Sequence, residues 1–381
     1  MFQSKEIITY IFIIGAAQGV LLSFWLFGKK ENPVANRMLA ITILAYSLDI
    51  LYALYTVTKL YLTYPLFIGV SGLFPFIYSP ALYLYIHIVS GGKKDFNLKQ
   101  LYHFIPAGSM LVAGIFGVFI FGDEVKLSLM DPYTEKSVFI IVMRTIIPLY
   151  GITYLFMSLS ELKKYHHRLK EKFSNIEKLK LNWLKYIIFG IAIVWMLEII
   201  QVILIDIVEK PDNIAYNYIY AAVSILIYLI TYKSLKQPEV FLFADEDNLK
   251  EKQKTSAYKK SGLSEEAASK SLNKLIKIME EEKPYLKNDL TLPDLASSIH
   301  LSTHNLSEVI NTKLNQNFYD FINKYRVEEV KRLIEKDEEI KFSILALGFE
   351  AGFSSKSAFY SAFKKVTGIT PAQYRSDIRK M

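Results

Sequence analysis

Seven apolar stretches, each close to or above the length that crosses a bilayer, dominate the first 235 residues of this chain. A helix needs roughly 20 apolar residues to span about 30 Å of hydrocarbon. The stretches are residues 7–27, 38–57, 64–89, 101–121, 138–158, 183–205 and 214–232. They predict a polytopic transmembrane bundle of about seven helices.

The third stretch is the least regular, because it contains Pro65, Pro75 and Pro80. Proline lacks a backbone N–H and clashes with the preceding turn, so it kinks or interrupts a helix. In a bilayer the freed backbone groups must find partners on neighbouring elements. We therefore expect an irregular third span.

Basic residues are distributed unequally between the two sets of predicted loops. The loops on one side contain 15 Lys and Arg residues, and those on the other side contain 5. Basic residues in short loops favour the cytoplasm. This bias predicts an N-terminus outside and a cytoplasmic chain after Tyr232, which requires an odd number of spans. The long predicted loop over residues 159–182 contains seven of these 15 basic residues.

The character of the sequence changes near residue 235. The next 31 residues are polar and charged, without an apolar stripe, and predict a linker that is part helical and part disordered. After it, Leu275 and Met279 share one face of a helix that Pro284 ends. The expected domains are a transmembrane sensor domain (1–235), a linker (236–266) and an all-helical C-terminal domain (267–381).

Residues 290–311 have the pattern of two short helices joined by a tight turn. Leu295 and Ala296 lie on the first helix, and the small Ala296 allows a close crossing. Ile299 and Leu301 would bury the turn. Ser302 is placed to cap the second helix, on which Leu306, Val309 and Ile310 face inward.

Residues 344–365 repeat this logic. Leu347 and Gly348 take the places of Leu295 and Ala296, and Gly352 with Phe353 makes the turn. Ser354 or Ser355 caps the following helix, and Phe359 and Phe363 point inward at helical spacing. Residues 317–334 lie between the two units and predict a long amphipathic helix that fixes their separation.

Many positions of this region, taken together and in order, resemble the DNA-binding domain of the AraC/XylS family. They are Leu295-Ala296, Ser302, Leu306, Tyr325-Arg326, Gly352-Phe353, Ser357, Phe359, Phe363-Lys364, Thr367-Gly368, Thr370-Pro371 and Tyr374-Arg375. In the membrane half, residues 74–86 (FPFIYSPALYLYI) and 101–107 (LYHFIPA) resemble parts of a seven-helix sensor that is fused to such domains in bacteria. The resemblance implies two helix-turn-helix units that bind DNA.

Three positions depart from the family pattern. Asn315-Gln316-Asn317 replaces the usual glycine before the long helix, although asparagine tolerates a left-handed turn. Gly348 stands where alanine is usual, which costs roughly 1 kcal/mol of helix propensity. The first recognition helix has Glu308 and no basic residue, so we expect the second unit to contribute more affinity.

The resemblance also implies which side chains meet DNA. Short or polar groups on the outward faces of the two recognition helices would read base edges in the major groove. Phosphate contacts would position the domain without reading sequence. The base-reading set is His304, Ser307, Glu308, Asn311, Lys356, Ser357, Tyr360 and Ser361, and the phosphate set is Arg326, Lys331, Lys364 and Lys365.

Three ionisable residues lie inside the apolar stretches. Asp49, Arg144 and Glu198 each sit about 9–12 Å below the predicted outer surface, and Gln201 shares a helical face with Glu198. Charged groups at that depth are costly unless they turn inward and find partners. They form either a sensor pocket open to the outside or a structural ion pair, and the sequence leaves both readings open.

These features favour a transcription regulator in the bacterial inner membrane that couples an extracytoplasmic or in-membrane signal to promoter binding. Its expected partners are double-stranded promoter DNA, the lipid bilayer, an unknown small-molecule or membrane signal, a second copy in a homodimer, and RNA polymerase. The alternative is a membrane receptor or transporter whose helical tail binds a protein. Salt-dependent DNA binding separates the two.

An enzyme is disfavoured, because the sequence has no Walker loop, HExxH or GxSxG motif. Neither a metal nor a cofactor is expected. The chain has no cysteine, and its 6 histidines lack metal-ligand spacing.

Overall fold

The computed structural model describes residues 2–91, 97–120, 122–128, 138–177, 179–207, 214–236, 263–337 and 339–380. These residues form helices and no β-strand; Phe173 and Thr291 make an isolated antiparallel bridge. The expected all-helical fold is therefore confirmed for the described part of the chain. Most of the predicted linker lies outside the described residues.

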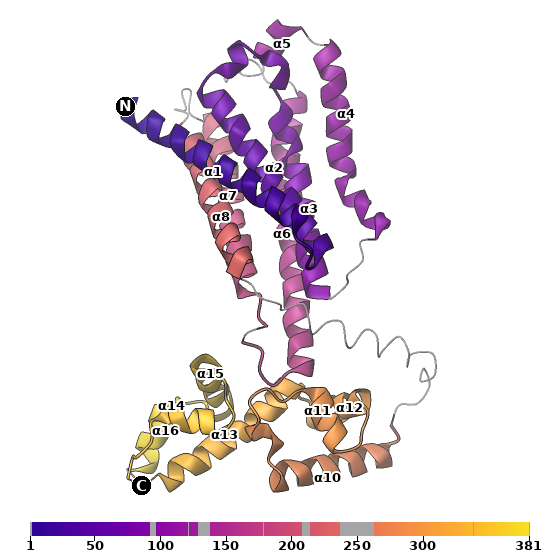
Figure 1. Ribbon diagram of the computed structural model, residues 1–381, viewed down its shortest axis with the longest axis vertical. Coiled ribbons are helices and arrows are strands. Elements are labelled where there is room, and N and C mark those ends of the chain that lie inside the picture. The colour runs from indigo at the N-terminus through magenta and orange to yellow at the C-terminus, as the bar shows by residue number, and fades with distance from the viewer. Residues whose placement is uncertain are drawn as a thin grey trace. The chain divides into compact units, whose positions relative to one another are not determined.

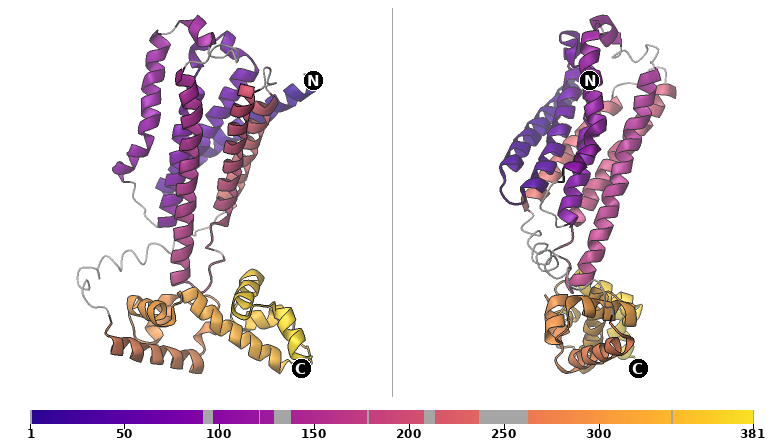
Figure 2. Two further views of the ribbon diagram at one scale, coloured as in Figure 1. Left: turned by 180° about the vertical axis from the view of Figure 1, so that it is seen from behind. Right: turned by 90° about the vertical axis from the view of Figure 1, so that its right-hand side faces the viewer.

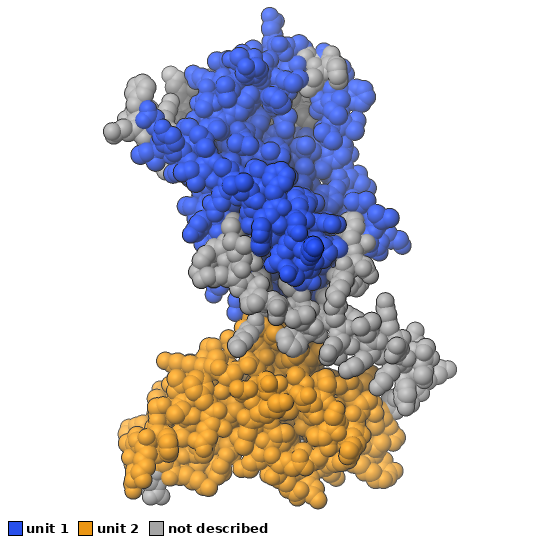
Figure 3. Space-filling view, viewed as in Figure 1, with its two compact units in different colours: residues 1–163, 181–248 blue, residues 164–180, 249–381 orange. Residues whose placement is uncertain are grey.

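The chain divides into two compact units (Figure 3). One unit comprises residues 1–163 and 181–248, and the other comprises residues 164–180 and 249–381. The division differs from the sequence-based boundaries at two places: it splits the predicted linker after residue 248, and it reassigns one internal segment. Residues 164–180, which lie within the predicted sensor domain, group with the C-terminal residues.

The first unit consists of long apolar helices with short 3-10 turns between them (Figure 1). Its helices are α1 (Phe2–Gly28), α2 (Pro33–Val57), α3 (Pro75–Gly91), α4 (Ile105–Ile120), α5 (Asp123–Ser128), the first part of α6 (Val138–Lys172), α7 (Asn182–Ile207) and α8 (Ile214–Lys236). The turns are η1 (Leu60–Leu62), η2 (Pro65–Phe67), η3 (Val70–Leu73) and η4 (Leu98–Phe104).

Helices overlap all seven predicted stretches, and five segments are long and apolar enough to cross a membrane. These five are Thr9–Gly28, Pro33–Val57, Pro65–Gly91, Thr145–Lys172 and Asn182–Ile200, while Ile219–Ile230 is a shorter apolar helix. The stretch over residues 101–121 divides into η4 and the 16-residue α4. A seven-span topology stays a prediction.

The third stretch is irregular, as its prolines predicted. It begins with η2 and η3 and becomes a regular helix only at Pro75, with Pro80 inside α3. The candidate span Pro65–Gly91 covers this stretch, and its irregular part is its beginning.

The first half of the predicted loop over residues 159–182 is helical. Helix α6 is 35 residues long and continues to Lys172. Figure 2 shows it as one long magenta helix. Residues 159–172 contain neither Gly nor Pro and are rich in Leu, Lys and Glu, all good helix formers. The change from apolar to charged residues thus alters the polarity of α6 without ending it.

Close helix crossings in the first unit depend on glycine. A Cβ on Gly151 of α6 would overlap the indole of Trp195 on α7, and a Cβ on Gly190 of α7 would lie 2.6 Å from Leu226 of α8. Because glycine has no Cβ, these large side chains fill the space directly.

The second unit contains eight named elements between residues 265 and 378, in addition to the end of α6. They are α10 (Glu265–Glu281), η5 (Pro284–Leu286), α11 (Leu292–Ser298), α12 (Thr303–Leu314), α13 (Phe318–Lys336), α14 (Ile344–Glu350), α15 (Lys356–Thr367) and α16 (Pro371–Ile378). Helix α13 contributes to two separate cores. Its Phe318, Phe321 and Ile322 pack with α10–α12, and its Val327, Val330 and Ile334 pack with α14 and α15. The expected long helix between the two units is confirmed.

Candidate nucleic-acid interface

The first pair of helices, α11 and α12, has the turn that the sequence predicted. His300 has a left-handed backbone with φ 55°, and the Leu301 N–H donates to the Ala296 carbonyl over 2.9 Å. Ser302 then caps α12 by accepting from the Asn305 N–H. At the other end of α12, Asn315 adopts φ 51° and closes the helix in place of the usual glycine.

The second pair, α14 and α15, repeats this turn. Gly352 has φ 92°, and the Phe353 N–H donates to the Gly348 carbonyl over 3.1 Å. Ser355, rather than Ser354, caps α15 by accepting from the Ala358 N–H. The second turn is therefore one residue longer than the first.

Gly348 is explained by its neighbour. A Cβ at this position would lie 2.7 Å from Cδ1 of the fully buried Phe359. In the first helix-turn-helix unit, the corresponding pair is Ala296 with the smaller Leu306. Glycine therefore compensates for the larger aromatic ring.

The base-reading residues predicted on α12 differ in exposure. The His304 side chain is 82% exposed and lies 3.7 Å from the Glu308 carboxylate, whose own side chain is 29% exposed. Ser307 is half-buried, and Asn311 is exposed and donates to Ser307 Oγ over 3.3 Å. All four belong to one outward face of α12, as expected from their helical spacing.

The predicted residues on α15 form a second outward face. Lys356, Ser357 and Ser361 are exposed, and Tyr360 is half-buried against Phe359. The Lys356 ammonium lies 5.5 Å from the centre of the Tyr360 ring. This face is basic, whereas the face on α12 carries a carboxylate.

Three of the four predicted phosphate contacts are on the surface or near it. Lys364 is exposed and follows Tyr360 by one helical turn, on the same face. Lys365 pairs with Asp320 over 2.7 Å, and Lys331 pairs with Glu328 over 2.7 Å. Such exposed pairs contribute little stability and can exchange partners.

The prediction that Arg326 contacts phosphate is wrong, because the structure buries this side chain. It is 1% exposed. Its guanidinium donates to the carbonyls of Tyr285, Lys287 and Ser174, to Ser174 Oγ and to Asn323 Oδ1, over 2.8–3.4 Å. These contacts use the donors that a phosphate would need, so Arg326 holds the interior of the domain together.

Sequence reasoning missed the end of α6 as part of this unit. Ser174 is 2% exposed, and its N–H and hydroxyl both donate to the Leu290 carbonyl, over 3.2 Å and 2.6 Å. Glu171 accepts from Asn311 over 3.2 Å. Only the basic charge of this segment was visible in the sequence, and charge suggested membrane topology instead.

The residues proposed for a sensor pocket belong to the first compact unit, residues 1–163 and 181–248. Asp49 on α2 is half-buried, accepts from the Tyr220 hydroxyl of α8 over 3.4 Å, and is close enough to Glu198 of α7 to interact electrostatically. The side chains of Arg144 and Gln201 lie outside the described residues, so the expected ion pair stays a prediction.

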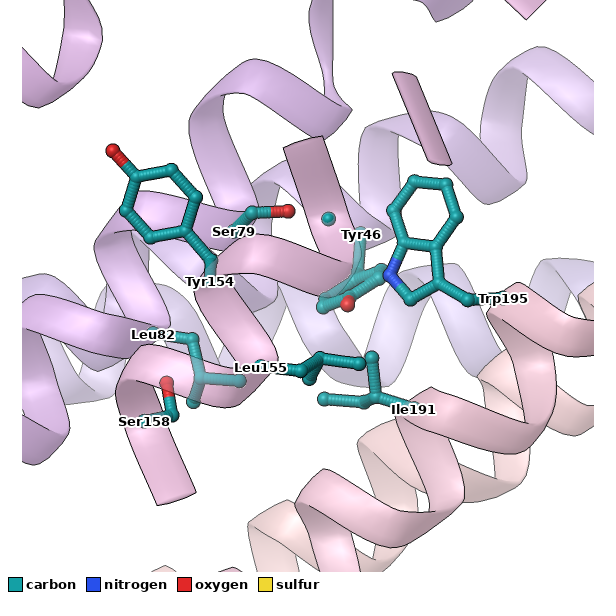
Figure 4. Close-up of a pocket in the computed structure, with 9 residues that line it drawn as sticks. Tyr46, Ser79, Leu82, Tyr154, Leu155, Ser158, Ile191 and Trp195 are labelled. Atoms are coloured by element: carbon teal, nitrogen blue, oxygen red, sulfur yellow. The ribbon is translucent and has the colours of Figure 1, made fainter. Parts of the chain in front are cut away.

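A separate small cavity lies between α2, α3, α6 and α7 (Figure 4). Tyr46, Tyr154 and Trp195 border it together with Ser79 and Ser158, and neither Asp49 nor Glu198 lines it. The Tyr46 ring, which borders the cavity, stacks on Tyr78 with centroids 4.0 Å apart.

Comparisons with known proteins concern the C-terminal part of the chain. Residues 295–377 match a family model described as a helix-turn-helix domain. An uncharacterized HTH-type transcriptional regulator of Staphylococcus aureus is 32% identical over 93 residues, which are 24% of this chain and 12% of that protein. The melibiose operon regulatory protein of Escherichia coli is 31% identical over 86 residues, 23% of this chain and 28% of that protein. The matches thus span less than a third of either relative.

A solved structure is also similar. The C-terminal domain of AraT, a response regulator from Geobacillus stearothermophilus, is 26% identical, with 31% of this chain and 88% of that chain covered and a TM-score of 0.25. The family match agrees with the paired turns and caps described above. The C-terminal residues of this chain therefore form an AraC-type helix-turn-helix domain.

Proposed function

We propose that the protein is a membrane-bound, sequence-specific transcription regulator whose apolar half couples an extracytoplasmic or in-membrane signal to promoter binding. One observation carries the proposal: two helix-turn-helix units built on a shared helix α13 occur in the same chain as five segments of bilayer-crossing length and apolarity. The first feature supports DNA binding, and the second supports attachment to a membrane.

The two recognition helices would divide the work of reading DNA. Lys356 can donate to guanine, and Glu308 can accept from a cytosine amine. Lys364 and Lys365 would contact phosphates. Since both units belong to one chain, a single protomer could bind two successive major-groove faces about 34 Å apart. A homodimer formed through the membrane half would add affinity by raising the effective concentration.

DNA binding is tested with the full chain in lipid nanodiscs and a random-sequence DNA duplex library. We expect selection of a preferred duplex whose affinity falls steeply with salt, because binding to phosphates releases counterions. Lys364→Ala should weaken binding and flatten the salt dependence. The matched control, Lys277→Ala, removes an exposed lysine from α10 and should change neither. Absence of salt-dependent binding to any duplex would favour the alternative, a membrane receptor or transporter whose helical tail binds a protein.

Membrane topology is tested with reporters that are active only in the cytoplasm. A reporter fused after Met381 should be active, and one inserted between α5 and α6 should be silent. The opposite pair of results would reject the regulator, because its helix-turn-helix domain would lie on the wrong side of the membrane from DNA.

A further inference from the structure

The end of helix α6 and the turn after it are docked on the helix-turn-helix domain. Residues 164–180 belong to the same compact unit as that domain. We call residues 170–176 the α6 clamp. Within it, Phe173 bridges Thr291, the residue that caps α11, and Ile176 is 1% exposed. The clamp is thus seated in the domain like an additional element of its fold.

The clamp contacts the residue at the junction of the two helix-turn-helix units. Arg326 donates to the Ser174 carbonyl and to Ser174 Oγ, both over 3.2 Å. The same guanidinium donates to Tyr285 in η5 and lies 5.9 Å from the ring of Phe353, in the turn of the second unit. Arg326 therefore links the clamp to both units at once.

The clamp also reaches the recognition helix of the first unit. The Glu171 carboxylate accepts from Asn311, a candidate base-reading residue, and the Lys170 ammonium lies 5.9 Å from the centre of the Tyr319 ring at the start of α13. A carboxylate held at the DNA-facing side of α12 would repel phosphates and occupy the amide that would read a base.

Covalent continuity supplies a route for a signal. Helix α6 runs without interruption from Val138 to Lys172, so its apolar and charged parts are one element. The docking contacts, by contrast, are noncovalent: they include the bridge to Thr291, the hydrogen bonds of Glu171 and Ser174, and the buried side chain of Ile176. A displacement of α6 along or about its axis would therefore be transmitted to the clamp and could break them.

We propose that the α6 clamp is an autoinhibitory element: docked, it blocks the first recognition helix from DNA, and withdrawal of α6 releases that helix. The inference rests on the proposed function, because it assumes that α12 reads DNA. The basic residues around the clamp allow the opposite role, an extension of the DNA-binding surface, and the experiment below separates the two.

The absence of native cysteine makes a specific test available. Antiparallel bridge partners have Cα atoms about 4.5–5.5 Å apart, within the range of a disulfide. Phe173→Cys with Thr291→Cys should therefore lock the clamp in place under oxidising conditions. The full chain in nanodiscs is assayed on the duplex selected from the random library. We expect the oxidised protein to bind at least about tenfold more weakly than the same protein after reduction. The affinity of Thr291→Cys alone for the duplex should be the same under oxidising conditions and after reduction.

Glu171→Ala provides a second, independent measurement without a cross-link. It should bind the duplex several-fold more tightly than the unaltered chain, because the contact with Asn311 is lost. The matched control is Glu266→Ala, which removes the same charge from an exposed site on α10 and accounts for general electrostatic attraction. Equal gains in the two variants would reject autoinhibition, as would equal or tighter binding in the oxidised state.

The outcomes distinguish this inference from the proposed function. If neither the unaltered chain nor Glu171→Ala binds any duplex, the proposed function fails. If both bind equally and the disulfide has no effect, DNA binding stands and the autoinhibitory clamp is overturned. If the cysteine pair prevents folding, the comparison between Glu171→Ala and Glu266→Ala decides alone.

Discussion

Gly348 lies against the face of Phe359, with 2.7 Å between the position of a Cβ on the glycine and Cδ1 of the ring. Phe359 is fully buried. Gly348→Ala gains about 1 kcal/mol of helix propensity but overpacks the core, which typically costs about 1–3 kcal/mol. We expect a net loss of stability in the second helix-turn-helix unit, seen as faster amide hydrogen exchange in α14 and α15.

The first helix-turn-helix unit suggests which second substitution would compensate for Gly348→Ala. There, Ala296 and Leu306 occupy the corresponding positions in a core of similar design. Gly348→Ala combined with Phe359→Leu should therefore exchange more slowly than Gly348→Ala alone. If amide hydrogens of the double variant exchange faster than those of Gly348→Ala and of Phe359→Leu measured alone, the close contact does not explain why position 348 is glycine.

Arg326 should behave as a structural residue and not as a phosphate contact. Burial lowers the pKa of Arg326 to about 10, so its guanidinium stays charged near neutral pH. Arg326→Lys keeps a charge but loses the planar group of five donors. We expect it to destabilise the domain by roughly 3 kcal/mol, since several buried carbonyls lose a charged donor. Hydrogen exchange in α11–α15 measures this. A folded variant with only a flatter salt dependence would restore the original phosphate assignment.

Lys356 and Lys365 should affect DNA binding differently. Lys356 is exposed near the start of α15, so Lys356→Ala should change the preferred base at one position by roughly 1–3 kcal/mol. Lys365 pairs with Asp320 at the surface, and Lys365→Ala should weaken all duplexes alike and reduce the salt slope by about one. Binding to a panel of single-base variants of the selected duplex separates these effects. Uniform losses for both variants would contradict the placement of α15.

The carboxyl groups of Asp49 and Glu198 are the described part of the candidate sensor pocket. Their side chains come from α2 and α7, and Tyr220 of α8 donates to Asp49, so three helices meet there. We expect Glu198→Gln to abolish the promoter response to an inducing condition at a normal membrane level of protein, with Arg144→Met acting alike. Loss of the protein itself would indicate a structural ion pair instead. An unchanged response would place sensing elsewhere.

The sequence by itself determined the features that depend on neighbouring residues. Each helix-turn-helix unit was predictable, because a small residue, a turn residue and a capping serine recur at short, fixed spacing. The Ser302 cap, the left-handed Asn315 and the irregular start of the third span follow from local backbone chemistry. Apolar length likewise predicted helices in all seven stretches.

Only the tertiary structure decided the contacts between residues far apart in the chain. The sequence suggested a loop after residue 158 because polarity changes there, yet nothing in those residues stops a helix, and α6 continues to Lys172. Arg326 resembled a surface cation because its acceptors include the carbonyls of Tyr285, Lys287 and Ser174, and backbone carbonyls have no signature in a sequence. Ser174 and Arg326 meet although 152 residues separate them. Packing of distant segments creates that contact, and hydrophobic periodicity carries no information about it.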